Sequence, residues 1–241
     1  MEKKIALSWP PLIEGRLIKR YKRFLADVEL NDGQIVTCHT PNTGSMLDCS
    51  ETGRPVYLSQ SPNPKRRYPF SWEMIAMEDG LVGLNTLLPN KLAFLAFEAG
   101  VMEGFPKKAI VKREARLGAS RLDLLVTSEA LNGQPGEEIW VEVKSATLVR
   151  DGRAYFPDAV SLRGTKHLEQ LISLTGQGRR ALLLVMVQRA GAQVFSPADF
   201  IDPKWGAALR RAAAEGVEIS VRGVDLNLRE ASLGPKLKVE L

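Results

Sequence analysis

The pattern of hydrophobic and polar positions changes character near residue 83 of this 241-residue chain. From Glu14 to this point, short apolar runs alternate with turn signals such as Asn31-Asp32-Gly33. In the run 24–31 the even-numbered positions are apolar and most odd-numbered positions are polar, so one face of a strand points into a core. About five short strands without a clear helix predict a small OB-like β-barrel in preference to a sandwich.

Beyond residue 83 the spacing becomes that of alternating helices and strands. The segment LAFLAFEAGVM (92–102) has apolar residues at helical spacing, and further helices are predicted around 165–174 and after Pro203. The run ALLLVMVQ (181–188) is apolar on both faces, as a central strand covered by helices on each side requires. The pattern therefore predicts an OB-like barrel over residues 1–83 and an α/β domain over residues 84–241.

Composition narrows the class of protein. A hydrophobic content of 44% with 25% charged residues is typical of a soluble globular chain, and the net charge of +5 attracts polyanions only where it is clustered. Cys38 and Cys49 cannot form a disulfide framework, and two histidines exclude a Cys/His zinc site, so buried, reduced thiols are expected. The N-terminus lacks an apolar signal region, and the longest apolar run (181–187) is too short to span a bilayer. We expect a cytoplasmic protein.

The most informative chemistry is Asp123 in RLDLLV, followed by Glu142 and Lys144 in WVEVKS. Residues two apart on a strand share a face, so Glu142 and Lys144 project together, and the intervening hairpin brings Asp123 beside them. Paired carboxylates can hold Mg²⁺ or Mn²⁺ through oxygen, and a neighbouring lysine can stabilise developing charge. This set is the one that metal-dependent phosphodiester hydrolysis uses.

Other residues near this set are candidates for supporting roles. Glu114 is a candidate further acid, nine residues before Asp123. A Glu-x-Lys pair is also an ordinary surface ion pair worth about 0–1 kcal/mol. Lys166 and His167, on the predicted helix that follows, can reach the same face, although a histidine that caps or lines the helix is the favoured interpretation.

Basic and aromatic residues gather in two segments of the first half, a first cluster at residues 19–24 and a second at residues 65–72. Cations would hold phosphates there, and exposed rings could stack on bases without reading the sequence. The alternative is a solvated strand face with Phe24 and Trp72 in the core. The polar residues of the turn at 40–46 are explained by a purely structural role as well as by contact of their backbone amides with a phosphate. The candidate nucleic-acid contacts are Lys19, Arg20, Tyr21, Lys22, Arg23, Lys65, Arg66 and Arg67.

In a series of segments that span most of the chain, the sequence resembles the sugar fermentation stimulation protein family of bacteria and archaea. These segments are LIKRYKRFLADV, HTPNTGSM, PKRRYPFSWEM, NTLLPNKLA, SRLDLLV, VEVKSATL, YFPDAVSLRGTKHL and FSPADFID. The resemblance implies an N-terminal OB-type domain and a C-terminal α/β domain similar to the PD-(D/E)XK, or restriction-endonuclease-like, nucleases, with a mixed central sheet.

The resemblance also implies roles for single residues. Carried over by position, Asp123, Glu142 and Lys144 occupy the nuclease signature, and Glu114 is the upstream acid. Leu122-Asp123 stands where the superfamily pattern has Pro-Asp, a departure that leaves the role of the acid intact. The family is associated with DNA binding of low sequence specificity and, in enteric bacteria, with a regulatory part in maltose utilisation.

Three hypotheses follow. The first is a DNA-binding protein with a Mg²⁺- or Mn²⁺-dependent nuclease site, for which RNA is an alternative substrate and the oligomeric state is open. The second is a non-catalytic DNA-binding regulator of sugar metabolism that keeps a nuclease-like scaffold. The third is a sugar-binding or interaction protein with incidental basic patches. Metal-dependent cleavage separates the first from the second, and sugar titration tests the third.

Overall fold

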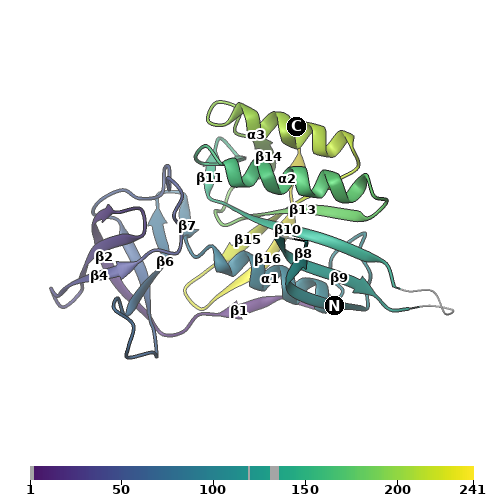
Figure 1. Cartoon of the computed structure of the whole chain (residues 1–241). Coiled ribbons are helices and arrows are strands. Elements are labelled where there is room, and N and C mark those ends of the chain that lie inside the picture. Colours follow the sequence, from purple (N-terminus) through teal and green to yellow (C-terminus); the bar gives the residue numbers. More distant parts are fainter. Residues whose placement is uncertain (1–2, 119, 131–135) are drawn as a thin grey trace.

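The computed structural model describes residues 3–118, 120–130 and 136–241, which form a β-barrel beside a helix-covered sheet (Figure 1). The barrel strands are β2 (Leu12–Tyr21), β3 (Leu25–Leu30), β4 (Ile35–His39), β5 (Pro55–Gln60), β6 (Phe70–Met77) and β7 (Gly80–Gly83). They follow the order β4-β3-β2-β5-β6-β7, and β4 also pairs with β6, which closes the barrel. The N-terminal part is therefore an OB-type barrel, as the sequence predicts.

The local sequence explains the barrel hairpins. The turn at Asn31-Asp32-Gly33 joins β3 to β4, with Gly33 at a φ of 83° that favours glycine. Of the even-numbered positions predicted to face the core, Ala26 and Val28 are fully buried. Phe24 is instead 41% exposed, because it lies in the turn at residues 22–24 that joins β2 to β3 and not in the strand itself.

The second part is a mixed seven-stranded sheet with the order β1-β16-β15-β13-β10-β9-β8. Its strands are β1 (Ala6–Ser8), β8 (Ala109–Leu117), β9 (Ser120–Ser128), β10 (Glu138–Ala146), β13 (Arg180–Val187), β15 (Glu218–Leu226) and β16 (Glu230–Lys236). β10, β13 and β15 are parallel, and the other pairs are antiparallel. β13 is central and buried from Ala181 to Val187, which confirms the strand predicted from its doubly apolar pattern.

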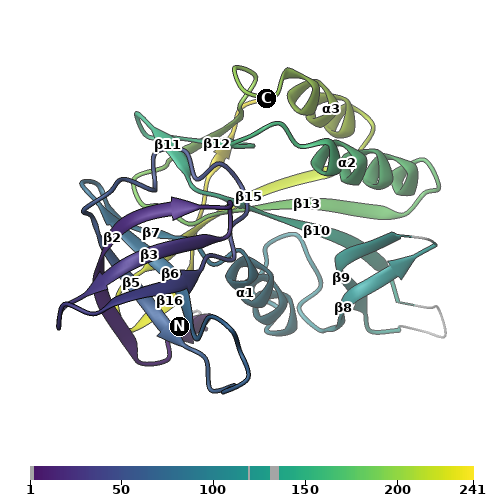
Figure 2. The ribbon, with the colours of Figure 1, turned by 60° about the vertical axis from the view of Figure 1, so that its left-hand side comes forward.

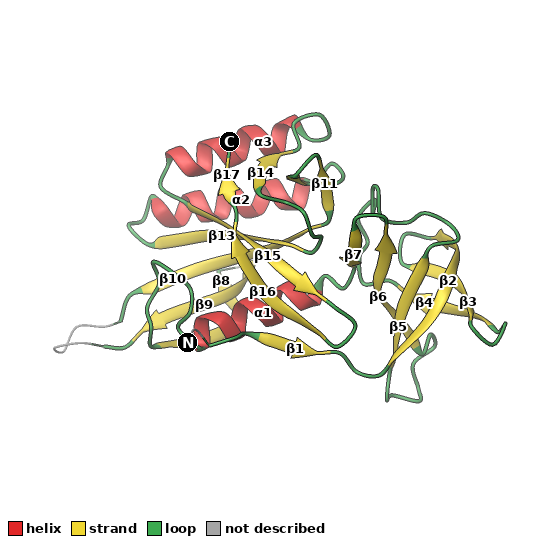
Figure 3. Ribbon diagram, turned by 180° about the vertical axis from the view of Figure 1, so that it is seen from behind, coloured by secondary structure: helices red, strands yellow, loops and turns green. Residues whose placement is uncertain are grey.

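Helices cover both faces of this sheet (Figure 2). α1 (Leu87–Glu98) packs on one face, and α2 (Leu162–Thr175) and α3 (Pro203–Ala214) pack on the other. All three fall where helical spacing predicts them. A second small sheet, seen from behind in Figure 3, has the order β11-β12-β14-β17. Its strands are β11 (Leu148–Arg150), β12 (Arg153–Phe156), β14 (Val194–Pro197) and β17 (Lys238–Val239).

The two parts are in direct contact. Arg189 of the sheet domain donates to both carboxylate oxygens of Asp79 at 2.7 and 2.9 Å, and the Gly83 amide donates to the Gln188 carbonyl at 2.8 Å. The division at residues 83 and 84 stays a prediction. One element does not follow it, because β1 crosses to the second sheet and pairs with β16.

Two sequence expectations about burial can be checked directly. Cys38 and Cys49 are free thiols and fully buried, as expected. Burial raises the pKa of Cys38 to about 12 and that of Cys49 to about 11. Within the described ranges, no helix has both the length and the apolar character needed to cross a membrane.

Candidate active site

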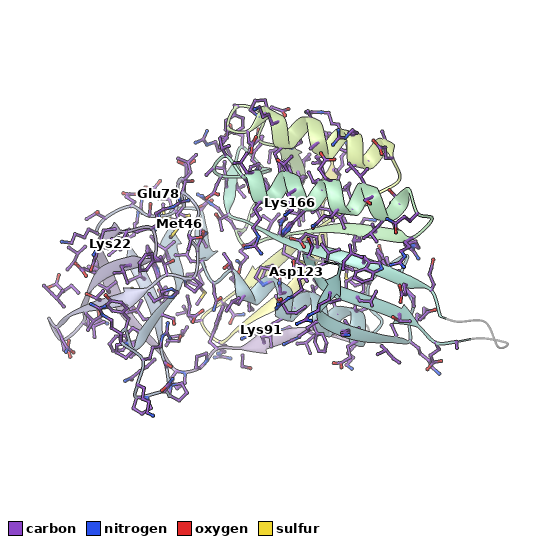
Figure 4. All side chains as sticks on the ribbon, in the orientation of Figure 1. Lys22, Met46, Glu78, Lys91, Asp123 and Lys166 are labelled. Carbon is purple, nitrogen blue, oxygen red and sulfur yellow. The ribbon has the colours of Figure 1, made fainter. Side chains whose placement is uncertain are left out.

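A polar cleft of about 310 Å³ lies where the barrel meets the sheet domain. The barrel contributes the loop 41–44 that follows β4, and the sheet domain contributes the remaining walls. Figure 4 shows Asp123 near the centre of the molecule, below α2. The lining residues are Pro41, Asn42, Thr43, Gly44, Thr86, Asn90, Asp123, Glu142, Val143, Lys144, Ser145, Ala146, Thr147, Tyr155, Phe156, Asp158, Arg163 and His167.

Glu142 and Lys144 lie side by side on β10 because alternate residues of a strand share a face. Val141 and Val143 point the other way, into the core packed against α1. The Glu142 side chain is 3% exposed and that of Lys144 is 13% exposed, and Lys144 Nζ lies 2.6 Å from Glu142 Oε1. The predicted common face of Glu142 and Lys144 is therefore present, in a buried ion pair rather than a surface one.

His167 of α2 completes this cluster. Its Nδ1 contacts Glu142 Oε1 and lies 3.1 Å from Lys144 Nζ. The favoured sequence interpretation, a histidine that merely caps or lines its helix, is therefore wrong. Burial acts to raise the pKa of Glu142, but the hydrogen bond with His167 and the charge of Lys144 outweigh it, so the pKa is lowered. Glu142 is thus held as a carboxylate.

Asp123 is held at the point where two strands separate. β9 pairs with β10 as far as Leu124, which lies opposite Val141. At the next position the backbone pairing ends, and the Asp123 side chain bonds to the β10 backbone in its place. Its Oδ2 accepts from the Val143 amide at 2.8 Å and its Oδ1 accepts from Asn90 Nδ2 at 2.7 Å. Burial, and then the negative charge of Glu142, raise the pKa of Asp123 to about 6.

The two carboxylates fit a divalent cation in donor chemistry. Each is an oxygen ligand of the kind that Mg²⁺, Mn²⁺ and Ca²⁺ prefer, and the influence of Glu142 on the pKa of Asp123 shows a repulsion that a cation would relieve. Among the residues that the structure describes, no group of three or more His, Cys, Asp or Glu is arranged to hold a metal. Asp123 and Glu142 are the side chains that could hold one.

Glu114 is not brought to the cleft. It lies on β8 with its side chain 63% exposed, 3.4 Å from Arg121 in an ion pair. Its φ of 49° interrupts the regular alternation of the strand, and the side chain turns to solvent. The expectation that Glu114 assists Asp123 and Glu142 finds no support in this arrangement.

The candidate nucleic-acid contacts all lie on the barrel, and none lines the cleft. Arg20 is not an open phosphate contact, because it donates to the carbonyls of Arg23, Asn42, Gly44 and Ser45. Burial lowers its pKa. The first cluster is further engaged internally, since Tyr21 donates to Asp27 at 2.8 Å and Lys19 lies 3.6 Å from the same carboxyl group.

The remaining basic residues are more accessible. Lys22 and Arg23 form the turn between β2 and β3, with positive φ angles, and Arg23 donates to the Thr43 carbonyl at 3.1 Å. Lys65 and Arg67 are exposed on the connection between β5 and β6, where Arg66 donates to Ser71 at 2.9 Å. For these residues DNA contact stays a prediction.

Sequence patterns assign no role to several residues of the cleft. Arg163 is four positions before His167, and this spacing places both on one face of α2. Asp158, between β12 and α2, accepts from Ser45 Oγ at 3.1 Å and from the Met46 amide at 2.9 Å. The family resemblance could have identified these residues, because every residue that lines the cleft belongs to one of the segments that carry it.

Comparisons with known proteins agree with this architecture. The family described as "Sugar fermentation stimulation protein RE domain" matches residues 87–230, and "SfsA N-terminal OB domain" matches residues 18–84. Sugar fermentation stimulation protein homologs from Citrifermentans bemidjiense and Shewanella woodyi are 47% and 42% identical, each over 96% of this chain and 98% of the relative. The structure of Pyrococcus furiosus SfsA in complex with Ca²⁺ matches with a TM-score of 0.88 and 28% identity over 100% of both chains. The chain therefore belongs to the sugar fermentation stimulation protein family.

Proposed function

We propose that this protein is a metal-dependent nuclease that binds DNA with low sequence specificity and hydrolyses phosphodiester bonds in the cleft between its two parts. The observation that carries this proposal is the convergence of Asp123, Glu142 and Lys144 in that cleft. Mg²⁺ or Mn²⁺ is the proposed cation. A bound Ca²⁺ in the Pyrococcus furiosus relative supports a divalent cation in this family.

Each side chain has a role that its contacts support. Asp123 and Glu142 would hold the cation, which supplies a Lewis acid for the phosphate and lowers the pKa of bound water. Asn90 and the Val143 amide orient the Asp123 carboxylate. Lys144 places a positive charge next to Glu142, where it can stabilise negative charge that develops on the phosphate. His167 fixes the Glu142 carboxylate from the helix side.

The test is a cleavage assay on labelled single-stranded and double-stranded DNA and RNA with Mg²⁺, Mn²⁺ or EDTA. Wild-type protein should cut only with metal, and Asp123→Ala, Glu142→Gln and Lys144→Met should each lower the rate at least 100-fold. Glu138→Gln is the matched control, because Glu138 is an exposed acid at the other end of the same strand. Cleavage that survives in all three cleft variants would refute the proposal.

A non-catalytic DNA-binding regulator linked to sugar metabolism is the second candidate. The observation that favours it is that Glu142 is already neutralised by Lys144 and contacted by His167, an arrangement that needs no cation to be stable. Such a protein would bind DNA equally well in EDTA and in Mg²⁺, and would cut no substrate. Binding should weaken steeply with salt, because phosphate contacts dominate binding of low specificity.

A further inference from the structure

The barrel loop 41–44 forms a fixed wall of the cleft rather than a free edge. On one side, Thr86 Oγ1 at the start of α1 donates to the Pro41 carbonyl at 3.2 Å. On the other side, Asp158 accepts from Ser45 Oγ and from the Met46 amide. The loop is therefore tied to the sheet domain at both of its ends, across the mouth of the cleft.

The loop is also held from beneath. Arg20 donates to the carbonyls of Asn42, Gly44 and Ser45 at 2.8–3.2 Å, and the Gly44 amide donates to Asn42 Oδ1 at 2.8 Å. At Gly44 a side chain would force its neighbours to shift, because an added Cβ would lie 2.9 Å from Asn42 Oδ1 and from Asp158 Oδ1. These contacts fix the distance between the barrel wall and the acids on the opposite side.

The cleft is open on one side, but it is small for a double helix. Its volume of about 310 Å³ is at the lower end of the roughly 300–1,000 Å³ found for sites that bind small molecules. The Glu142 side chain in this cleft is only 3% exposed, so a phosphate must enter the cleft to reach it, which a flexible single strand can do more readily than a stacked and paired duplex. The lining offers contacts for both parts of a nucleotide. Lys144 and Arg163 can bind its phosphate, and the amide groups of Asn42 and Asn90 can hydrogen-bond to its base.

We propose that this cleft accepts one unpaired nucleotide at a time, so that the substrate is a single strand or an unpaired strand end rather than the interior of a duplex. This inference rests on the proposed nuclease function for its cleavage readout. It adds a role for the barrel: besides binding nucleic acid, its loop 41–44 excludes the second strand. Ser45 and Asp158 are then specificity residues that set the width of the cleft.

The first experiment compares cleavage of one labelled oligonucleotide as a single strand, as a blunt duplex and as a duplex with an unpaired overhang, in Mg²⁺ or Mn²⁺. Wild-type protein should cut the single strand and the overhang at least 10-fold faster than the duplex interior. Ser45→Ala and Asp158→Ala should each lower this ratio at least threefold, because the wall is then free to move. Thr52→Ala is the matched control, since its hydroxyl donates to the Ile18 carbonyl within the barrel. Equal cutting of single strand and duplex interior by wild-type protein would overturn the inference.

A second measurement separates this inference from the proposed function. If no substrate is cut under any condition, the nuclease proposal fails, and binding alone decides the inference. A fluorescent trinucleotide should then bind wild-type protein at least fivefold more tightly than it binds Gly44→Ala, whose added methyl group meets the Asn42 and Asp158 side-chain oxygens and disturbs the hydrogen bonds that hold the loop. A blunt duplex, held by the outer barrel surface, should bind both proteins alike. Equal trinucleotide affinity in wild-type protein and Gly44→Ala, with matching thermal melts, would refute the inference.

Discussion

The two carboxylates of the cleft should respond in opposite ways to neutralisation. In Asp123 the folded protein raises the pKa, which means that ionisation at neutral pH costs stability. In Glu142 the folded protein lowers the pKa, which means that the charged form contributes stability. We therefore expect Asp123→Asn to stabilise the protein and Glu142→Gln to destabilise it, although both remove one negative charge from the same cleft.

The size of the first effect follows from the pKa values. A rise from 3.8 to about 6 corresponds to roughly 3 kcal/mol at pH 7.5. In Asp123→Asn the new amide oxygen still accepts from the Val143 amide, and the new amide nitrogen can donate to Asn90 once that side chain turns. Allowing for this rearrangement, a gain of about 2 kcal/mol should raise Tm by about 4–8 °C for a protein of this size.

The destabilisation expected for Glu142→Gln comes from Lys144, which loses its ion-pair partner. Glu142→Gln leaves the Lys144 ammonium, whose side chain is only 13% exposed, without its counter-charge. Breaking a buried pair costs roughly 3–5 kcal/mol, and the glutamine oxygen, which can still accept a hydrogen bond, places this change at the lower end. Tm should therefore fall by about 6–12 °C.

The measurement is thermal melting of wild-type protein and both variants in EDTA, at pH 7.5 and at pH 4.5. Between the unfolded and folded pKa values of Asp123 the folded state binds more protons, so wild-type stability from this group falls as pH rises from about 4 to about 6. The electrostatic part of the gain should accordingly shrink from roughly 3 to roughly 1 kcal/mol at pH 4.5, which about cancels the cost of rearrangement, so Asp123→Asn and wild type should melt at nearly the same temperature there. The reasoning is refuted if Asp123→Asn melts below wild type at pH 7.5, or if its advantage does not depend on pH.

Four further predictions concern the barrel and its junction with the sheet domain. Arg20→Lys should lower Tm by several degrees, because a lysine cannot donate to the same set of carbonyls, and should leave the salt dependence of DNA binding unchanged. Lys22→Ala should leave Tm unchanged and should reduce the slope of log affinity against log salt concentration. Arg189→Ala should cost about 1–3 kcal/mol and make the chain near residue 84 easier to cleave in limited proteolysis, because the contacts to Asp79 are lost. Cys38 and Cys49 should react with a thiol reagent only after denaturant is added, since burial raises both pKa values; rapid reaction of the native protein would contradict the buried placement.

The sequence by itself determined the elements and their class. Strand alternation, the Asn31-Asp32-Gly33 turn and the doubly apolar run at 181–188 depend on neighbours in the chain, so the barrel, the three helices and the central strand were predictable. The common face of Glu142 and Lys144 was predictable for the same reason, because two residues of one strand have a fixed relation.

The tertiary structure decided which distant residues meet. Glu114 has the right residue type and a suitable place along the chain, but its backbone conformation turns it to solvent. His167 is a lone helical histidine in the sequence, yet the packing of α2 against the sheet, mainly at β13, brings it to Glu142. Arg20 lies in a basic cluster typical of phosphate contacts, and only the folded loop shows that carbonyl oxygens accept from its two terminal nitrogens. Spacing along the chain fixes local geometry, whereas contacts across the cleft depend on how the barrel and the sheet domain pack, which no local pattern records.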